Sequence, residues 1–390
     1  MQVIHAPRAL LDGRFVGPVT IEVDGDLIAD VSTGPHRPPR GAGRWLDDGF
    51  LTAGLVDLQI NGSYGVDFAA ADPEQWQMVS RRLPATGVTA YLPTFITAPI
   101  ADLQAGLDRT FAAQQAQHTH GLSSARILGA HLEGPFLSER RAGAHDATLM
   151  IDPTPRELDG LLDSPQRRTA LRLVTLAPER PFAVEAIRTL TAAGVVVSVG
   201  HSDADADCAS RAAAAGATLV THLFNAMADL DHRAPSLPAR VLADARFRLG
   251  LVADLHHVDP DLLRLVLAAA AERVVLVTDA VAAAGLPPGS FKLGQTTVTT
   301  SSGDLLPRRP DGVLAGSVLS LDQAVRNLVS LGVSVEESML AASRNPADAL
   351  GRADLGRLQA GAKADLVWWS DDLDVQQVWV GGRACLPRDG

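Results

Sequence analysis

The stretch VVVSVGHSDADADCASRAAAAGATLVTHLF, residues 195–224, contains two apolar runs separated by an alanine-rich segment. VVVSVGHS and ATLVTHLF have the length and composition of buried strands, and each carries a histidine near its end. Residues 203–215 between them are rich in alanine, the strongest helix former. A strand, a helix and a further apolar strand in succession are typical of a parallel α/β fold.

The same pattern recurs along most of the chain. We count eight apolar runs, at residues 54–62, 88–95, 125–134, 171–179, 195–202, 217–224, 247–258 and 273–281. Helical stretches separate most of them, for example residues 182–193, 203–215 and 259–271. Eight β/α units close a TIM-type barrel. An open, doubly wound sheet is the alternative, but no G-x-G-x-x-G fingerprint follows the first run. We therefore predict a (β/α)8 barrel.

Both chain ends differ from this middle part. VTIEVDGDLIADVS, residues 19–32, predicts two strands joined by an Asp-Gly hairpin turn. KADLVWWSDDLDVQQVWVGGRACL, residues 363–386, again has short strand-like runs around turns. We predict that residues 1–50 and 356–390 form one small β domain, and that residues 51–355 form the catalytic barrel.

Composition limits the function. With 46% hydrophobic and 20% charged residues the chain is globular rather than disordered. A net charge of −11 argues against nucleic-acid binding, which needs a basic surface. Cys208 and Cys385 are far apart, so a disulfide framework is not expected. Because no signal peptide or membrane-spanning run is apparent, we predict a cytoplasmic protein without a membrane partner.

Polar residues stand at the ends of several strands, where a barrel places its active site. They include Gln59, Asn61, His131, Glu133, His201, His222, Asp254, His256, His257 and Asp279. One such histidine alone is more often structural. The combination of two imidazoles and one carboxylate instead favours a hydrolytic metal site with an open position.

The proposed ligands are Glu133, His201 and His222. A bound divalent ion lowers the pKa of a water and polarises a carbonyl, and a nearby carboxylate can move the proton. We assign that role to Asp279; the alternative is that it caps the following turn. Zn is the default metal for this ligand set, and Fe, Mn or Co can occupy it.

Several motifs follow one another in an order that resembles the N-acetylglucosamine-6-phosphate deacetylases of the amidohydrolase superfamily. They are HLEGPFLSERRAGAHD (131–146), GHSDAD (200–205), THLFNAM (221–227), ADLHHVD (253–259), LVTDA (276–280), LAGSVLSLDQAVRNLV (314–329), SRNPADALG (343–351) and GRLQAGAKADLVWW (356–369). HLEGPF and THLFNAM are the most specific of these. The resemblance covers nearly the whole chain and implies a barrel with a small β-sandwich formed by both ends, and a homodimer.

The resemblance also implies residue roles. Glu133, His201 and His222 match the metal ligands, Asp279 matches the catalytic acid/base, and His145 matches a histidine that polarises the acetyl carbonyl. The substrate-binding positions that it implies are Ala144, Asn225, Ala226, Arg233, His257, Leu314, Ala315 and Gly316. Asn225, Ala226 and Arg233 match the phosphate site, although Arg233 read alone is nearly as consistent with a solvated loop. His256 falls at a variable position and receives no role.

Gln59 and Asn61 stand where many amidohydrolases have His-x-His, which binds one ion of a metal pair. Strand alternation predicts that Asp57, Gln59 and Asn61 share one face and that Gln59 and Asn61 point toward the barrel mouth. Amides are poor metal ligands and better donors to water or substrate. We therefore predict a vacant second-metal position and one divalent ion per chain.

The leading hypothesis is hydrolysis of the acetamide of N-acetylglucosamine 6-phosphate, giving glucosamine 6-phosphate and acetate in amino-sugar catabolism. The galactosamine epimer is an alternative substrate. Another amidohydrolase activity, such as that of a cyclic amidase, is disfavoured by HLEGPF and THLFNAM. A catalytically inactive sugar-phosphate binding protein is disfavoured because the ligand trio and Asp279 occur together.

Overall fold

The computed structural model describes residues 1–34, 43–120 and 124–385. Its central feature is a parallel barrel with eight strand positions among these residues, because β12 and β13 pair in succession with β11 and form one broken strand. The strands are β8 (Leu55–Ile60), β11 (Val88–Ile96), β12 (Arg126–Ile127), β13 (Ala130–Glu133), β14 (Leu171–Leu176), β15 (Val196–Val199), β16 (Leu219–Val220), β17 (Arg248–Leu251) and β18 (Val274–Leu276).

The barrel closes where the first and last strands meet. The backbone N–H of Asp279 donates to the carbonyl oxygen of Gln59 at 2.8 Å, and that of Asn61 donates to Ala280 at 2.8 Å. The predicted (β/α)8 barrel is therefore confirmed. This junction also brings the first-strand amides next to Asp279, which follows β18.

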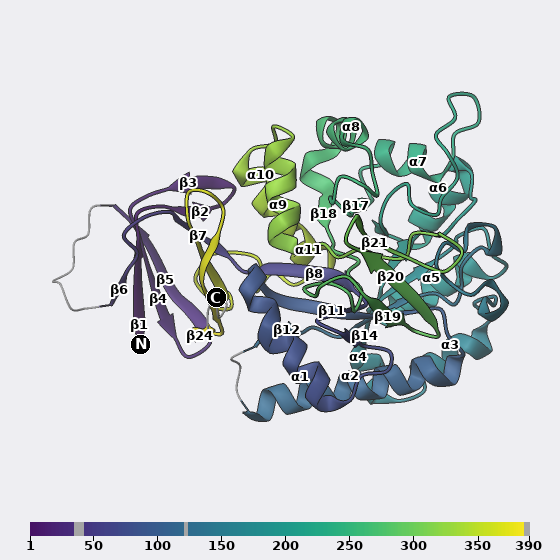
Figure 1. The fold of residues 1–390 in the computed structure, drawn as a ribbon, viewed down its shortest axis with the longest axis horizontal. Helices are drawn as coiled ribbons and strands as arrows, with labels where there is room; N and C mark the ends of the chain where they lie inside the picture. Colours follow the sequence, from purple (N-terminus) through teal and green to yellow (C-terminus); the bar gives the residue numbers. More distant parts are fainter. Residues whose placement is uncertain (35–42, 121–123, 386–390) are drawn as a thin grey trace.

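Helices surround the barrel in Figure 1. They are α1 (Pro73–Arg82), α2 (Ile100–His120), α3 (Pro155–Leu162), α4 (Pro165–Ala170), α5 (Ala183–Ala192), α6 (Ala206–Ala215), α7 (Leu237–Ala243), α8 (Pro260–Ala270), α9 (Leu321–Ser330), α10 (Val335–Ala342) and α11 (Arg344–Ala349). The alanine-rich α6 shows how sequence sets the bounds. The Asp205 side chain accepts from the Cys208 N–H at its start, and Gly216 ends it with φ +118°.

Two sheets lie beside the barrel, on the left of Figure 1, and one of them combines strands from both chain ends. One sheet has the order β24 (Arg383–Cys385), β23 (Val375–Val380), β22 (Leu366–Trp369), β7 (Phe50–Ala53), β2 (Ala9–Leu11) and β3 (Arg14–Val16). The other has the order β5 (Leu27–Thr33), β4 (Val19–Asp24), β1 (Gln2–Ala6) and β6 (Arg44–Trp45). Ile4, Ile21, Leu51, Leu366 and Trp379 belong to one buried cluster that joins them. The predicted β-sandwich from both ends is confirmed, whereas the limits at residues 50 and 355 stay a prediction.

A small antiparallel sheet follows the last barrel strand and was not foreseen from the sequence. It consists of β19 (Ser290–Leu293), β20 (Thr296–Ser301) and β21 (Asp304–Arg308). The Gly294 N–H at its first turn donates to Asp67 Oδ2 at 2.6 Å, and Asp67 ends the short β9 (Gly62–Ser63) and β10 (Val66–Asp67) hairpin. Leu293 and Val298 pack with Ala315, so this sheet forms part of the wall beside the barrel mouth.

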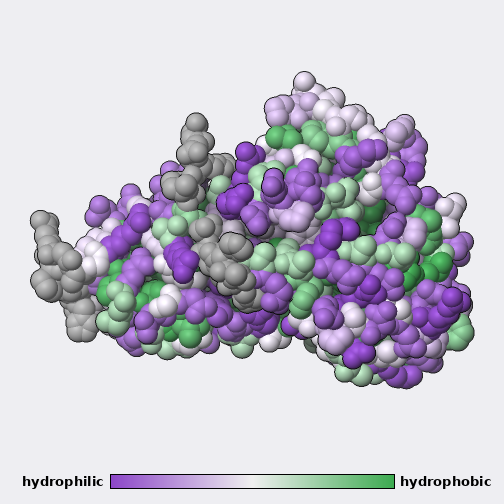
Figure 2. Space-filling view, turned by 90° about the horizontal axis from the view of Figure 1, so that it is seen from below, coloured by the Kyte–Doolittle hydropathy of each residue, from purple (hydrophilic) through white to green (hydrophobic). Residues whose placement is uncertain are grey.

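Figure 2 shows the smaller β lobe beside the larger barrel lobe, with hydrophilic and hydrophobic residues interspersed over the barrel face in view. None of the helices among the described residues combines the length and apolar character that a bilayer crossing requires.

Candidate metal and hydrolytic site

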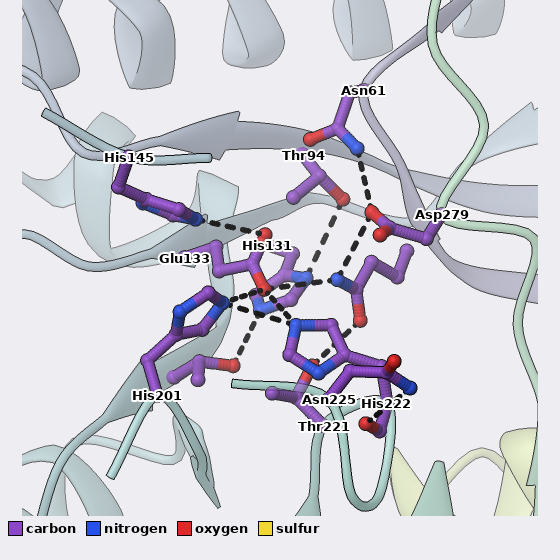
Figure 3. Close-up of polar contacts among 12 residues, drawn as sticks. Asn61, Thr94, His131, Glu133, His145, His201, Thr221, His222, Asn225 and Asp279 are labelled. Atoms are coloured by element: carbon purple, nitrogen blue, oxygen red, sulfur yellow. Dashed lines mark hydrogen bonds and ion pairs between the residues drawn. The ribbon is translucent and has the colours of Figure 1, made fainter. Parts of the chain in front are cut away.

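Three ligand atoms converge at the carboxyl ends of β13, β15 and β16. Glu133 Oε1 lies 2.8 Å from His222 Nε2 and 3.3 Å from His201 Nε2, and the two imidazole nitrogens are 3.1 Å apart (Figure 3). All three side chains are buried. Ligands about 2.0–2.2 Å from a tetrahedral ion lie roughly 3.3–3.6 Å from one another. The separation between Glu133 and His201 lies in this range and the other two are shorter by up to about 0.5 Å, so the trio needs to open slightly to hold an ion. Its two imidazoles and one carboxylate are ligands that suit one divalent ion.

His145 competes with His222 as the third ligand, because Glu133, His145 and His201 also present ligand atoms within 4.8 Å of one another. The Thr97 N–H donates to His145 Nδ1 at 3.2 Å, so that nitrogen carries the lone pair and the proton lies on Nε2. His201 has the opposite tautomer, because its Nδ1 donates to the Arg141 carbonyl oxygen at 2.9 Å. Nε2 of His201 is thus free to bind a metal, whereas Nε2 of His145 is a hydrogen-bond donor. The geometry favours the trio with His222.

The electrostatics of the site agree with these roles. Burial, and then the proximity of His201, lowers the pKa of His145 to about 4, so its ring is neutral near pH 7. Burial opposes the ionisation of Glu133, but its interactions with the three surrounding histidines, His145, His201 and His222, outweigh burial and hold its pKa well below the usual value. The trio therefore contains a carboxylate anion, as a cation site requires.

Asp279 is held by the two amides at the end of β8. Asn61 Nδ2 donates to Asp279 Oδ1 at 2.7 Å, and Gln59 Nε2 donates to the same oxygen at 3.2 Å and to Glu133 Oε1 at 3.0 Å. Thr221 Oγ1 in turn donates to Gln59 Oε1 at 2.6 Å. Burial, and then the charge of Glu133, raises the pKa of Asp279 to about 6. The neutral Gln59 amide thus bridges the two carboxylates at the predicted second-metal position, and the Asn61 amide donates to Asp279 beside it.

The expectation that Asp57 shares a face with Gln59 and Asn61 is wrong. Asp57 does not face the site with Gln59 and Asn61, because the pairing of β8 with β11 is irregular between Asp57 and Ile60. Its carboxylate instead accepts from Thr278 Oγ1 at 2.6 Å and lines a separate cavity together with Ile60 and Thr278. A β-bulge breaks the two-residue alternation on which the expectation rested.

The backbone is strained at several of these strand ends. His201 has φ +46°, Asp279 has φ +49° and Ala226 has φ +51°, in the left-handed region that side chains other than glycine rarely adopt. Such conformations are found where surrounding structure enforces them, often at functional sites. Here they turn strand-end side chains toward a common cavity.

That cavity has a volume of about 230 Å³. The sequence-predicted residues that line it are Asn61, Glu133, Ala144, His145, His201, His222, Asn225, Ala226, His257, Asp279, Leu314 and Gly316. Gln59 lies buried beneath them, and Ala315 is packed in the core under the small sheet. The cavity is also lined by Ile96, Gly143, Leu293 and Val313, for which the sequence motifs implied no role. Leu293 and Val313 come from the region of the small sheet, whose short runs gave no such signal.

The residues expected at the phosphate are less closely assembled. His257 lines the cavity, and its Nδ1 lies 2.6 Å from Asp254 Oδ2. Asn225 Nδ2 donates to the carbonyl oxygen of His222 at 3.2 Å. Arg233 is exposed and lies outside the cavity lining; its backbone N–H donates to Asp231 Oδ1 at 2.6 Å. His256 is exposed as well.

Comparisons with known proteins find similarity to an amidohydrolase family model and to deacetylases of phosphorylated N-acetyl amino sugars. The Amidohydrolase family model matches residues 50–385. The N-acetylglucosamine-6-phosphate deacetylase of Vibrio furnissii is 37% identical over 336 residues, 85% of this chain and 82% of that protein. The N-acetylgalactosamine-6-phosphate deacetylase of Escherichia coli O157:H7 is 39% identical over 383 residues, 98% of each chain. A structure of a mutant N-acetyl-D-glucosamine-6-phosphate deacetylase from Mycobacterium smegmatis, in complex with N-acetyl-D-glucosamine-6-phosphate, has a TM-score of 0.91 and 34% identity and covers 99% of both chains.

Proposed function

This chain belongs to the amidohydrolase family, and we propose that it hydrolyses the acetamide of N-acetylglucosamine 6-phosphate to glucosamine 6-phosphate and acetate. The observation that carries the proposal is the buried trio of Glu133, His201 and His222, with Asp279 lining the same cavity. Relatives with this activity in their names cover most of the chain.

We propose one divalent ion per chain, held by Glu133, His201 and His222, with Zn as the default and Fe, Mn or Co as alternatives. When bound, such an ion lowers the pKa of a water and polarises the acetyl carbonyl. Gln59 and Asn61 leave the second-metal position vacant, because amides supply neither negative charge nor strong nitrogen donation.

The remaining steps belong to the protein. Asp279 accepts the proton of the attacking water and returns it to the leaving amine, while Asn61 fixes its orientation through the 2.7 Å hydrogen bond. The neutral His145 lines the cavity with its Nε2 3.7 Å from Glu133 Oε2, and its Nε2–H stabilises negative charge that develops on the carbonyl oxygen of the substrate. Ala144 and the segment Leu314, Ala315 and Gly316 lie beside the sugar in this arrangement.

For the phosphate we propose Asn225, Ala226, His257 and Arg233. His257 lines the cavity, and backbone N–H groups of the strained loop at Ala226 are suited to an anion. We further propose that the protein acts in the cytoplasm as a homodimer, with residues 51–355 as its catalytic domain. The resemblance along the whole chain supports these points.

A second substrate has specific support. The N-acetylgalactosamine-6-phosphate deacetylase of Escherichia coli O157:H7 aligns along 98% of this chain at 39% identity, which is at least as high as the identity of the N-acetylglucosamine-6-phosphate deacetylases named above. The two sugars differ in the configuration of one hydroxyl. The same site chemistry therefore serves either epimer.

One assay tests the function. Acetate release is measured from both phosphorylated epimers and from their unphosphorylated forms, with metal content determined on the same sample. We expect turnover of a phosphorylated N-acetylhexosamine that depends on about one equivalent of metal. Absence of acetate release from all four sugars by metal-loaded protein would contradict the proposal.

A further inference from the structure

The loop that carries His145 is connected to the small sheet by one arginine. Arg309 directly follows β21, and its Nη1 donates to the carbonyl oxygen of Ala144 at 3.1 Å. Its Nη2 pairs with Asp311 Oδ2 at 3.1 Å, and its backbone N–H donates to Val313 at 2.9 Å. Arg309 thus joins two walls of the cavity, the loop around Ala144 and the segment at Val313.

The hydrogen bond from Arg309 holds the peptide group between Ala144 and His145, whose two polar atoms both have partners. The carbonyl oxygen of Ala144 accepts from Arg309, and the N–H of His145 in the same peptide donates to Ala142 at 3.0 Å. Beyond this peptide, Nδ1 of the His145 ring accepts from the Thr97 backbone and hydroxyl groups. Both the backbone and the ring of His145 are therefore held from outside the loop.

We propose that Arg309 is a positioning residue for His145, through which the small sheet β19–β21 fixes the group that polarises the acetyl carbonyl. This inference rests on the proposed function. Arg309 is not among the residues that line the cavity, so it acts on the substrate through His145. Its partner Asp311 is half exposed, and water weakens that ion pair. The bond to the Ala144 carbonyl is therefore the contact that couples Arg309 to the site.

The adjacent Arg308 offers a matched control. It is the last residue of β21, pairs with Asp304 at 3.0 Å and donates to the Gly312 carbonyl oxygen, both within the small sheet and its following loop. Arg309→Met should increase hydrogen exchange in the peptide covering residues 143–146, whereas Arg308→Met should leave it unchanged. This measurement needs no substrate. Unchanged exchange in Arg309→Met would overturn the inference even if the enzyme is a deacetylase.

A double-mutant cycle then tests the link to chemistry. Arg309→Met should lower kcat roughly ten- to hundredfold, since a small displacement of a catalytic group costs that much, with little change in KM or metal content. In a His145→Gln background the same substitution should cost less than about threefold, because the group it positions is gone. Equal losses in both backgrounds would show that Arg309 is only structural. Wild-type protein without acetate release would instead contradict the proposed function.

Discussion

At the reactive end of the cavity the side chains of Glu133 and His222 are buried, with Oε1 and Nε2 2.8 Å apart. At the proposed phosphate end Arg233 is exposed and lies outside the cavity lining. Buried polar groups must find partners within the protein, so the reactive end is organised before any substrate arrives. Exposed loop donors remain hydrated until an anion binds. Substitutions at the reactive end should therefore lower kcat, whereas substitutions at the phosphate end should reduce the preference for the phosphorylated sugar.

The largest effect is expected for Asp279→Asn at the reactive end. The Asn oxygen still accepts from Asn61, so the site keeps its shape, but the side chain no longer moves a proton. Turnover should fall by roughly 10²–10⁴-fold, with metal content and substrate affinity retained. Steady-state kinetics and metal analysis on the same sample measure this. A variant that keeps more than about a tenth of wild-type kcat would assign the acid/base to another residue.

Arg233→Ala probes the phosphate end. A charged hydrogen bond contributes about 1.5–3 kcal/mol, so kcat/KM for the phosphorylated sugar should fall about ten- to hundredfold. Use of the unphosphorylated sugar should hardly change. Arg264→Ala serves as the control, because Arg264 is also exposed but pairs with Asp261 on α8. Equal losses of kcat/KM on both substrates would show that Arg233 has a structural role and does not recognise the phosphate.

The amides of β8 provide a test of the metal count. Wild-type protein should reach full activity with one equivalent of metal, because Gln59 and Asn61 offer hydrogen-bond donors where a second ion would need anionic or imidazole ligands. Gln59→His combined with Asn61→His should raise metal content toward two equivalents. Metal analysis of chelator-free preparations, read beside activity titrations, decides this. Two tightly held equivalents in wild-type protein, both required for turnover, would reverse the prediction.

The reactive end was far more accessible to sequence reasoning than its surroundings. Barrel strands are continuous apolar runs, and their ends meet at one edge, so Glu133, His201 and His222 could be grouped without coordinates. The small sheet could not be foreseen, because β19 and β21 are only four and five residues long and β20, with the sequence TTVTTS, carries a single apolar residue. Asp57 was misplaced because a bulge leaves no clear mark in sequence. The contact of Arg309 with Ala144 spans 165 residues and follows only from the fold.

Asp57 lies on β8 outside the catalytic cavity, and its substitution tests whether residues beyond the cavity contribute to catalysis. Of the substitutions considered, Asp57→Asn should have the smallest effect on kcat. Its carboxyl is buried and accepts from Gln59 N–H and from Thr278, yet burial outweighs these bonds and raises its pKa from 3.8 to about 7. Because the folded state binds the proton more tightly than the unfolded state, this group stabilises the fold fully below pH 3.8 and loses that contribution as pH rises toward 7.

Asp57→Asn keeps an acceptor for the Gln59 N–H and removes the titration. Urea unfolding at about pH 5 and about pH 8 should show that the variant gains stability relative to wild-type protein at the higher pH, with kcat nearly unchanged. If the free energies of unfolding of wild-type protein and Asp57→Asn change with pH in the same way, Asp57 has the same pKa in the folded and unfolded states. A large loss of kcat in Asp57→Asn would show that Asp57 also contributes to catalysis.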